Sequence, residues 1–221
     1  MANLLRLVVY LFLCVSLNSF AALSIRDLDG DWSNGHEGVY DDVLDITWLA
    51  DANYAEGTGF LNSGRFDWWG AELLAQNLVI GNFDNWRLPS ILNSIDEYAN
   101  NMPYQNELNH IFQESLNYTT GGPFSASFVD SNTGDPYSFI NAQYTGHTYW
   151  FQEEWTFSTS SSHFFYGPYG PYFSSADSRD YRHVWPVHDG DIGLAPVPLP
   201  AGIYLFLSGL VGLGLMRARK D

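Results

Sequence analysis

The sequence predicts an α+β protein whose helices and antiparallel sheet come from different halves of the chain. Between residues 66 and 116, apolar side chains recur at helical spacing. After Gly121, short aromatic and β-branched runs alternate with Gly, Pro, Asn and Asp, which is typical of strands joined by long loops. We therefore expect two or three helices packed on one side of an antiparallel sheet.

Three segments are predicted to be helical. In the first, residues 66–81, apolar side chains lie three and four positions apart, with Asp67 placed to cap the start and Gly81 the end. A second helix is expected over residues 91–102, between a serine N-cap and a proline stop. A third, shorter helix is expected over residues 106–116.

The strands are predicted from alternating apolar residues. A short hairpin is expected within residues 39–55, where Leu44, Ile46 and Trp48 alternate with polar residues and share one inward face. Residues 22–38 are polar and rich in turn residues, so we expect them to precede the domain as an N-terminal segment. The remaining strands are expected in five later segments, namely residues 123–130, 137–144, 147–155, 156–167 and 179–187.

The N-terminal end is typical of an exported protein. Residues 1–21 combine a cationic residue, the apolar stretch 7–17 and a small-residue step before Ala22, as in a secretory signal peptide. Cleavage there removes Cys14, the only cysteine. We therefore expect no disulfide, cysteine-ligated metal or cysteine nucleophile in the mature protein.

The C-terminal end, residues 197–221, predicts a membrane-spanning helix that follows a linker at residues 192–196. Residues 199–216 are apolar or small, and a helix of that length extends about 27 Å, close to the thickness of a hydrocarbon core. Residues 217–220 carry three basic side chains, which keep the C-terminus cytoplasmic by the positive-inside rule. Everything before the helix then lies outside the cytoplasm.

The exported part, residues 22–196, is strongly acidic. It holds 24 acidic residues against five arginines and no lysine, a formal net charge of −19. Such a surface repels nucleic acid, so no nucleic-acid partner is expected. It is compatible with neutral glycans, cationic partners or loosely bound divalent cations, although solubility alone is a simpler use of the charge.

The order of several motifs resembles a known domain. These motifs are DITWLADANY, WWGAELLAQNLVIGNFDNWRLPS, YWFQEEW and HVWPVHDGD, at residues 45–54, 68–90, 149–155 and 183–191. Over residues 39–191 the chain resembles the Lcl C-terminal domain family, a bacterial extracellular family without an assigned general activity. Asn85 and His188 replace the aspartate and arginine usual there. The resemblance implies a C-type-lectin-like α+β fold, but no known ligand.

The tail carries a second resemblance. Its opening is VPLPA, formed by Val197, Pro198, Leu199, Pro200 and Ala201. With the apolar run and basic end, this is similar to the PEP-CTERM sorting signals read by exosortases, although Leu199 replaces the glutamate of the main form. The resemblance implies a membrane thiol protease that cuts near the motif and passes the domain to the cell surface or the exopolysaccharide matrix. A plain membrane anchor is the alternative.

Several residues of these motifs are expected to be structural. In NWRLP, Trp86 supplies apolar area, the Arg87 guanidinium can fork onto a carboxylate or carbonyls, and Pro89 holds the chain before the next helix. A catalytic role for Arg87 is the alternative. The other tryptophans of the resembling motifs are expected in the core, namely Trp48, Trp69, Trp150 and Trp185.

One candidate metal site lies near the N-terminus. Asp27, Asp29 and Asp31 occupy alternate positions, as at the start of a calcium loop. The twelfth residue from Asp27 is Gly38 instead of an acid, so the loop is no EF-hand. We therefore expect a solvated acidic turn and no cofactor, and a loose calcium site is the alternative.

The ligand candidates are aromatic. Tyr166, Tyr169 and Tyr172 recur every third residue in a Gly-Pro loop, and Trp155 is a further candidate. Their faces suit the C–H faces of sugar rings, and their polar tips suit hydroxyl groups. A loop folded onto its own domain is the alternative. No histidine pair has the spacing of a zinc helix and no GxSxG motif occurs, so no catalytic residue is assigned and no enzyme is expected.

Taken together, these patterns predict an exported domain that passes through an inner-membrane intermediate to the cell surface or matrix. There it is expected to bind or organise extracellular polymer, most simply polysaccharide, without covalent chemistry. The predicted partners are an exosortase-type sorting protease, the polysaccharide and, before processing, the membrane. A self-associating matrix protein without glycan specificity is the alternative, and an unrecognised enzyme is a third.

Overall fold

The computed structural model describes the domain between the two predicted targeting segments. The described residues are 22–57, 64–91, 106–118, 124–142, 148–154, 161–166 and 172–194. The predicted signal peptide, the sorting tail and all but the first residue of the predicted helix 91–102 lie outside them. Within the described ranges no helix is long and apolar enough to cross a membrane, and the predicted spanning helix at 199–216 is outside those ranges.

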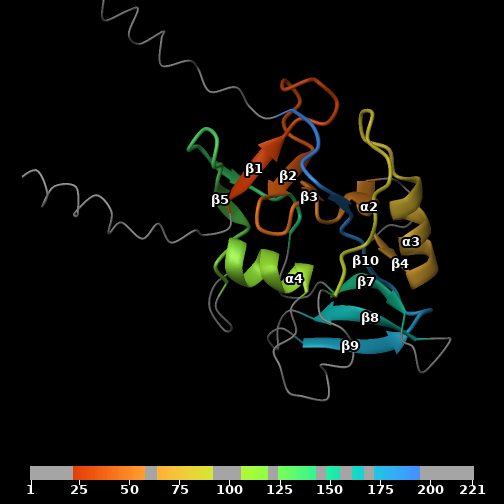
Figure 1. The fold of residues 1–221 in the computed structure, drawn as a ribbon. Helices are drawn as coiled ribbons and strands as arrows, with labels where there is room; N and C mark the ends of the chain where they lie inside the picture. The colour runs from red at the N-terminus through yellow and green to blue at the C-terminus, as the bar shows by residue number, and fades with distance from the viewer. Residues whose placement is uncertain are drawn as a thin grey trace, which may run out of the picture.

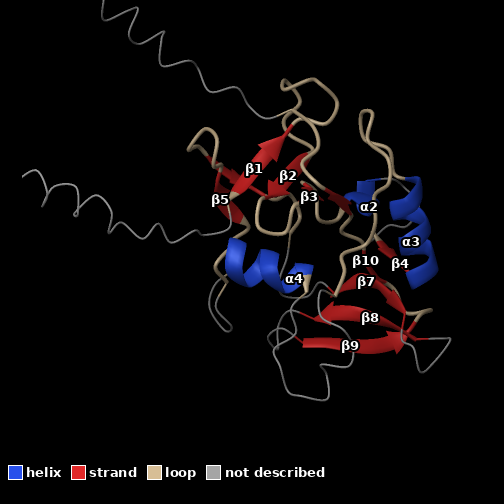
Figure 2. Ribbon diagram, viewed as in Figure 1, coloured by secondary structure: helices blue, strands red, loops and turns tan. Residues whose placement is uncertain are grey.

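The fold is mixed α+β with mainly antiparallel sheets, which confirms the predicted class (Figures 1 and 2). A four-stranded sheet has the order β1-β2-β3-β11, and each neighbouring pair is antiparallel. Its strands are β1 (Leu23–Arg26), β2 (Gly38–Asp41), β3 (Ile46–Leu49) and β11 (Val187–Asp189). The last strand of the domain therefore returns to pair with the predicted hairpin β2–β3.

Strand β1 comes from the segment expected to precede the domain. Leu23 and Ile25 are buried in the main core, and the intervening Ser24 and Arg26 are buried as well. Ser24 contacts Ser131 on the opposite side, so both faces of the strand are covered. The folded domain therefore includes β1 and does not begin at residue 39.

The predicted hairpin has a different burial pattern from the one expected. Ile46 and Trp48 are buried as predicted, while Leu44 packs against the core from the turn. Thr47, on the other face, is also fully buried and donates its hydroxyl to the Gly190 carbonyl at 2.8 Å. The alternation marks the two faces correctly, but neither face of this strand meets solvent.

A five-stranded sheet lies in the lower part of Figure 1, with the order β4-β10-β7-β8-β9. Its strands are β4 (Arg65–Phe66), β10 (Arg182–His183), β7 (Thr148–Glu154), β8 (Ser161–Tyr166) and β9 (Tyr172–Asp177). β10 and β7 run parallel, whereas the other neighbours are antiparallel. A separate ribbon pairs β5 (Ser127–Val129) with β6 (Pro136–Ser138).

The helices are few and short. α3 spans Trp68–Asn77, and the Asp67 carboxylate accepts a hydrogen bond from the Gly70 amide, as expected of an N-cap. The helix ends before Gly81, which therefore does not cap it. Gly81 has φ 59°, and a Cβ there would lie 1.8 Å from the Leu28 carbonyl oxygen, so this glycine is required by a close backbone approach.

The third predicted helix is observed in a different winding. α4 (Glu107–Asn109) continues into the π-helical segment η2 (His110–Ser115), while α2 (Tyr54–Gly57) is a single turn. Ile111 and Phe112 of η2 are fully buried in the main core. The centroid of the Phe112 ring lies 6.2 Å from that of Tyr149 in β7 and 5.7 Å from that of Trp185, which lies between β10 and β11. η2 therefore packs where the two sheets meet.

Tryptophan dominates the core, although Trp69 and Trp32 are exposed. Trp48, Trp86, Trp150 and Trp185 are almost fully buried, and the rings of Trp48 and Trp185 lie 4.9 Å apart. Trp69 is 44% exposed, which corrects its expected core position. Adjacent residues of a helix point in different directions, so Trp68 takes the inward position and Trp69 cannot.

Candidate cation and ligand site

The loop between β1 and β2 folds around one carboxylate. Asp27 is 1% exposed, and its Oδ1 accepts hydrogen bonds from the backbone amides of Asp29, Gly30 and Asp31 at 3.1, 2.7 and 3.2 Å. Its backbone pairs with Leu194 on the other side. The Asp27 side chain thus sets the turn and is itself held rigidly in place.

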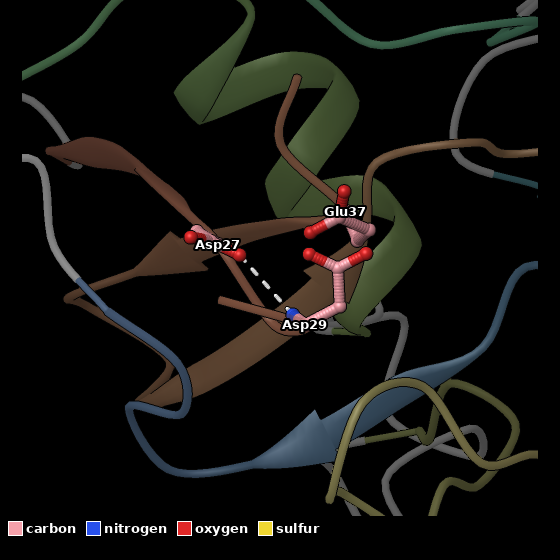
Figure 3. Close-up of side chains that lie close together, drawn as sticks. All are labelled: Asp27, Asp29 and Glu37. Atoms are coloured by element: carbon pink, nitrogen blue, oxygen red, sulfur yellow. Dashed lines mark hydrogen bonds between the residues drawn. The ribbon is translucent and has the colours of Figure 1, made fainter. Parts of the chain in front are cut away.

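Three carboxylates meet at this turn, as Figure 3 shows. Asp27, Asp29 and Glu37 each offer an oxygen, and these oxygens lie within 4.8 Å of one another. Glu37 reaches the group from the end of the loop and accepts the Leu28 amide through Oε2 at 3.0 Å. Carboxylate oxygens on a loop are ligands that hard cations prefer, so this group, the acidic cluster, can hold a metal ion.

The negative charge of the acidic cluster is poorly compensated. Within the described residues, none of its three carboxylates forms an ion pair with an arginine. The Asp27 Oδ2 atom is buried and has no hydrogen-bond partner. Because like charges at this distance repel one another, a bound cation would stabilise the loop.

Asp31, which the alternating pattern grouped with Asp27 and Asp29, lies outside the acidic cluster. Its Oδ1 accepts hydrogen bonds from the Ser33 hydroxyl and the Ser33 amide, and these bonds lower the pKa of the Asp31 carboxyl. Glu37 takes its place instead. The sequence pattern missed Glu37 because only the closing of the loop onto β2 brings it back to Asp27.

A pocket of about 210 Å³ adjoins the acidic cluster and shares Glu37 with it. Its other lining residues come from the same loop, β3, α2 and two neighbouring loops, namely Asn34, His36, Leu49, Ala50, Asp51, Tyr54, Ile80 and Ile140. Burial lowers the pKa of the His36 imidazole, which is therefore neutral at pH 7. Its Nε2 atom is buried without a hydrogen-bond partner. The pocket thus combines an apolar floor with several polar groups.

Of the four predicted aromatic ligand residues, Tyr166 and Tyr172 belong to strands of the five-stranded sheet. Tyr166 and Tyr172 are opposite each other in the β8–β9 pairing, at the end where the hairpin loop begins. Tyr169 and Trp155 lie outside the described residues, as do the sorting residues 197–201. The pocket beside the acidic cluster was not predicted, because its lining is gathered from segments up to about a hundred residues apart.

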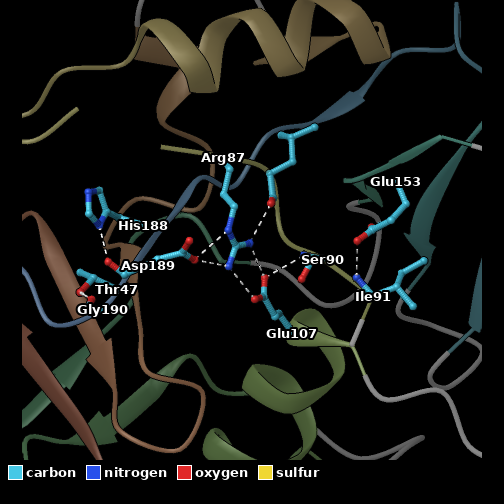
Figure 4. A network of polar contacts seen from close by, with 10 residues as sticks. Thr47, Arg87, Ser90, Ile91, Glu107, Glu153, His188, Asp189 and Gly190 are labelled. Carbon is cyan, nitrogen blue, oxygen red and sulfur yellow. Dashed lines mark hydrogen bonds and ion pairs between the residues drawn. The ribbon is translucent and has the colours of Figure 1, made fainter. Parts of the chain in front are cut away.

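A second cluster of charged residues surrounds Arg87, as Figure 4 shows. Nη1 and Nη2 of Arg87 bind the two oxygens of Glu107 at 2.9 and 2.8 Å, while Nε and Nη2 bind Asp189 at 2.9 and 2.6 Å. Burial opposes the charged form of Arg87, but the bonds and charge of Glu107, and then of Asp189, outweigh burial and hold its pKa above the usual value. This arginine cluster ties α4 and β11 to the NWRLP segment.

The residues around Arg87 fix the path of that segment. Asn85 has φ 64°, a left-handed conformation that asparagine tolerates better than most residues. Trp86 donates its indole N–H to the Phe83 carbonyl. The backbone carbonyl of the buried Pro89 accepts a hydrogen bond from the backbone N–H of Gln152 at 2.9 Å. Arg87, Trp86 and Pro89 therefore hold a backbone turn, which is the role expected of them.

No protein-family model, curated protein or solved structure matches this chain. The acidic cluster and the adjoining pocket offer cation ligands, neutral hydrogen-bonding groups and apolar surface side by side. Such a combination is suited to recognising a hydroxyl-bearing ligand without covalent change.

Proposed function

We propose that this protein is an exported binder of extracellular glycan, which seats one sugar unit in the pocket beside a calcium ion at the acidic cluster. The observation that carries the proposal is that Glu37 belongs to both the pocket and the cluster. A ligand in the pocket therefore lies next to any ion held by Asp27, Asp29 and Glu37.

The chemistry of the pocket favours a sugar. Asp27, Asp29 and Glu37 each offer one oxygen, whereas calcium takes six to eight oxygen ligands, so hydroxyl groups of a ligand can help to complete its shell. Asn34, Asp51 and neutral His36 supply further hydrogen-bonding groups, and Tyr54 and Ile140 supply flat or apolar surface. A volume of about 210 Å³ is below the ~300–1,000 Å³ typical of small-molecule sites, which suits one unit of a polymer.

The proposed cellular setting follows from the targeting segments. Residues 1–21 direct export, the apolar run of residues 199–216 holds the chain in the inner membrane, and an exosortase-type protease reads residues 197–201. The product then reaches the surface or the exopolysaccharide matrix. The mixed α+β fold with long loops is compatible with the lectin-like architecture implied by the resemblance. Mass spectrometry of surface protein tests the sorting step, because finding residues 217–221 still attached would contradict cleavage.

Binding of the full chain to a panel of polysaccharides, with calcium and with chelator, tests the function. We expect calcium-dependent binding that is weakened at least tenfold by Glu37→Gln and by Tyr54→Ala. Tyr181→Ala is the matched control, because Tyr181 is exposed and does not line the pocket. If no polysaccharide binds and the chain instead forms concentration-dependent oligomers, the alternative of a self-associating matrix protein takes the place of this proposal.

A further inference from the structure

A second cleft lies next to the arginine cluster and is lined in part by Arg87. Its volume is about 270 Å³, and it is lined by Glu72 and Gln76 of α3, by Arg87 and Leu88, and by Gln152 of β7. In Figure 4, α3 is the helix that passes above Arg87. This α3 cleft shares no lining residue with the pocket beside the acidic cluster.

The arginine in the α3 cleft is not available to an anionic ligand. All five of its N–H groups are used: two bind Glu107, two bind Asp189 and one binds the Leu88 carbonyl at 3.1 Å. Two carboxylates also outweigh its single positive charge. Glu72 adds further negative charge to the lining, so the cleft disfavours phosphate, sulfate or carboxylate groups.

The remaining polar groups of the cleft suit a neutral ligand. Gln76 and Gln152 are exposed and carry side-chain amides, which donate and accept hydrogen bonds without a charge. Gln76 donates to Glu72 one turn earlier in the helix at 3.1 Å, which orients its amide. Hydroxyl groups, which also donate and accept, are the complementary chemistry.

An exposed tryptophan, Trp69, lies on the same face of α3 as two residues of the cleft, although it does not line the cleft itself. Trp69, Glu72 and Gln76 are spaced i, i+3 and i+7, so they share one face of α3 over about 10 Å. Apart from Trp69 and Trp32, the described tryptophans are at most 4% exposed. Trp69 is therefore an exposed aromatic side chain on the face of α3 that also carries Gln76, two turns away, at a position where the core does not require it.

We propose that the α3 cleft is a second, cation-independent binding site for a neutral, hydroxyl-rich polysaccharide chain. The indole of Trp69 stacks on one sugar ring, and the amides of Gln76 and Gln152 bind hydroxyl groups of the next. The ligand class is that of the proposed function, but the residues are different and no metal ion is needed. With two sites on one domain, the protein would join neighbouring polymer chains and gain avidity on a single one.

The test is affinity electrophoresis of the full chain in gels that contain dextran or galactomannan, run with excess EDTA. EDTA silences a calcium-dependent site, so any remaining retardation reports the α3 cleft. We expect retardation of the wild-type protein in at least one of the two gels, and a dissociation constant at least tenfold weaker for Trp69→Ala and for Gln76→Ala. Both positions are exposed, and unchanged thermal unfolding will show that the variants fold.

Trp32→Ala is the matched control, because among the described residues Trp32 is the other exposed tryptophan and it lies in the loop of the acidic cluster. It should leave retardation in EDTA unchanged. The proposal is overturned if EDTA abolishes all retardation in both gels, or if Trp69→Ala and Gln76→Ala migrate as the wild type does. Loss of only the calcium-dependent part, in contrast, would concern the pocket beside the acidic cluster.

Discussion

The acidic cluster and the arginine cluster both contain aspartate and glutamate side chains, but the negative charge is balanced in only one of them. Around Arg87, Glu107 is 3% exposed in its side chain and each of its oxygens has a cationic partner. Around Asp27, three carboxylates face one another and none pairs with an arginine among the described residues. A compensated buried acid is therefore part of the framework, whereas an uncompensated group of acids is free to hold a cation.

Two further carboxyl groups complete the comparison. Asp41 is fully buried and faces the imidazole of His110, whose Nε2 lies 3.4 Å from its Oδ2. Glu153 accepts the Ile91 amide through Oε1, while its Oε2 is buried without a partner. The first acid is compensated by a group that titrates, and the second can become neutral by taking a proton. The four cases differ in how their charge is balanced, and they respond differently to mutation and pH.

The largest effect is expected from Arg87→Met. The change leaves Glu107 buried without its cation, and breaking such a pair costs about 3–5 kcal/mol in the free energy of unfolding. Urea unfolding of the full chain measures it. A loss below about 1 kcal/mol would show that the arginine cluster is not part of the framework and would break the comparison.

A smaller effect is expected from Glu153→Gln, and it depends on pH. Burial raises the pKa of Glu153 to about 7 from 4.5. Because the folded state then holds its proton more tightly than the unfolded state, the stability it contributes is lost as pH rises from about 4.5 to about 7. Glutamine mimics the neutral form, so the variant should be about 3 kcal/mol more stable than wild type at pH 8. At pH 4.5 the two should be equal, as thermal unfolding at both values will show.

His110→Gln tests whether the charge of Asp41 is balanced by a group that titrates. Burial lowers the pKa of His110, but the hydrogen bond and charge of Asp41, and then the charge of Glu114, outweigh it and raise the pKa above 6.5. The ion pair therefore stabilises the fold fully below pH 6.5, and this contribution is lost as pH rises through the raised pKa. We expect the variant to lose about 1 kcal/mol at pH 5.5 and less at pH 9. An equal loss at both values would contradict a titrating partner for Asp41.

The smallest effect is expected from Arg179→Met. Arg179 and Asp177 form an ion pair at 2.8 Å, but both side chains are largely exposed, so water and salt screen the pair. No change in the unfolding midpoint is expected. A clear loss of stability would mean that pairing alone, without burial, decides what the charged groups of this protein do.

Local features of the fold were predictable from the sequence, and contacts between distant segments were not. The spacing of apolar residues and Asp67 predicted α3, because a helix and its cap are set within a few residues. The same spacing also places Trp68, three residues before Ala71 and seven before Ala75, on the inward face, so the exposure of Trp69 follows from the pattern as well. β1 was missed because its four residues alternate too briefly to stand out.

The same limit applies to the sites. Asp27 and Asp29 were candidates because they are neighbours in one turn, whereas Glu37 joins them only when the β1–β2 loop closes. Arg87 was expected to bind a carboxylate, but its partners, 20 and 102 residues further along the chain, could not be named. Both pockets are lined by segments that only the tertiary fold brings together.

Calcium titration of the full chain, followed by thermal unfolding and calorimetry, shows whether the acidic cluster holds a calcium ion. With a dissociation constant of about 10⁻⁴–10⁻³ M, as in other extracellular sites, calcium at a hundredfold excess over that constant should stabilise the wild type by about 2.7 kcal/mol. Glu37→Gln should lose this effect, and Asp31→Asn, which changes a residue outside the acidic cluster, should keep it. A calcium site at the acidic cluster is contradicted if calcium does not stabilise the wild type, or if Asp31→Asn loses the effect and Glu37→Gln retains it.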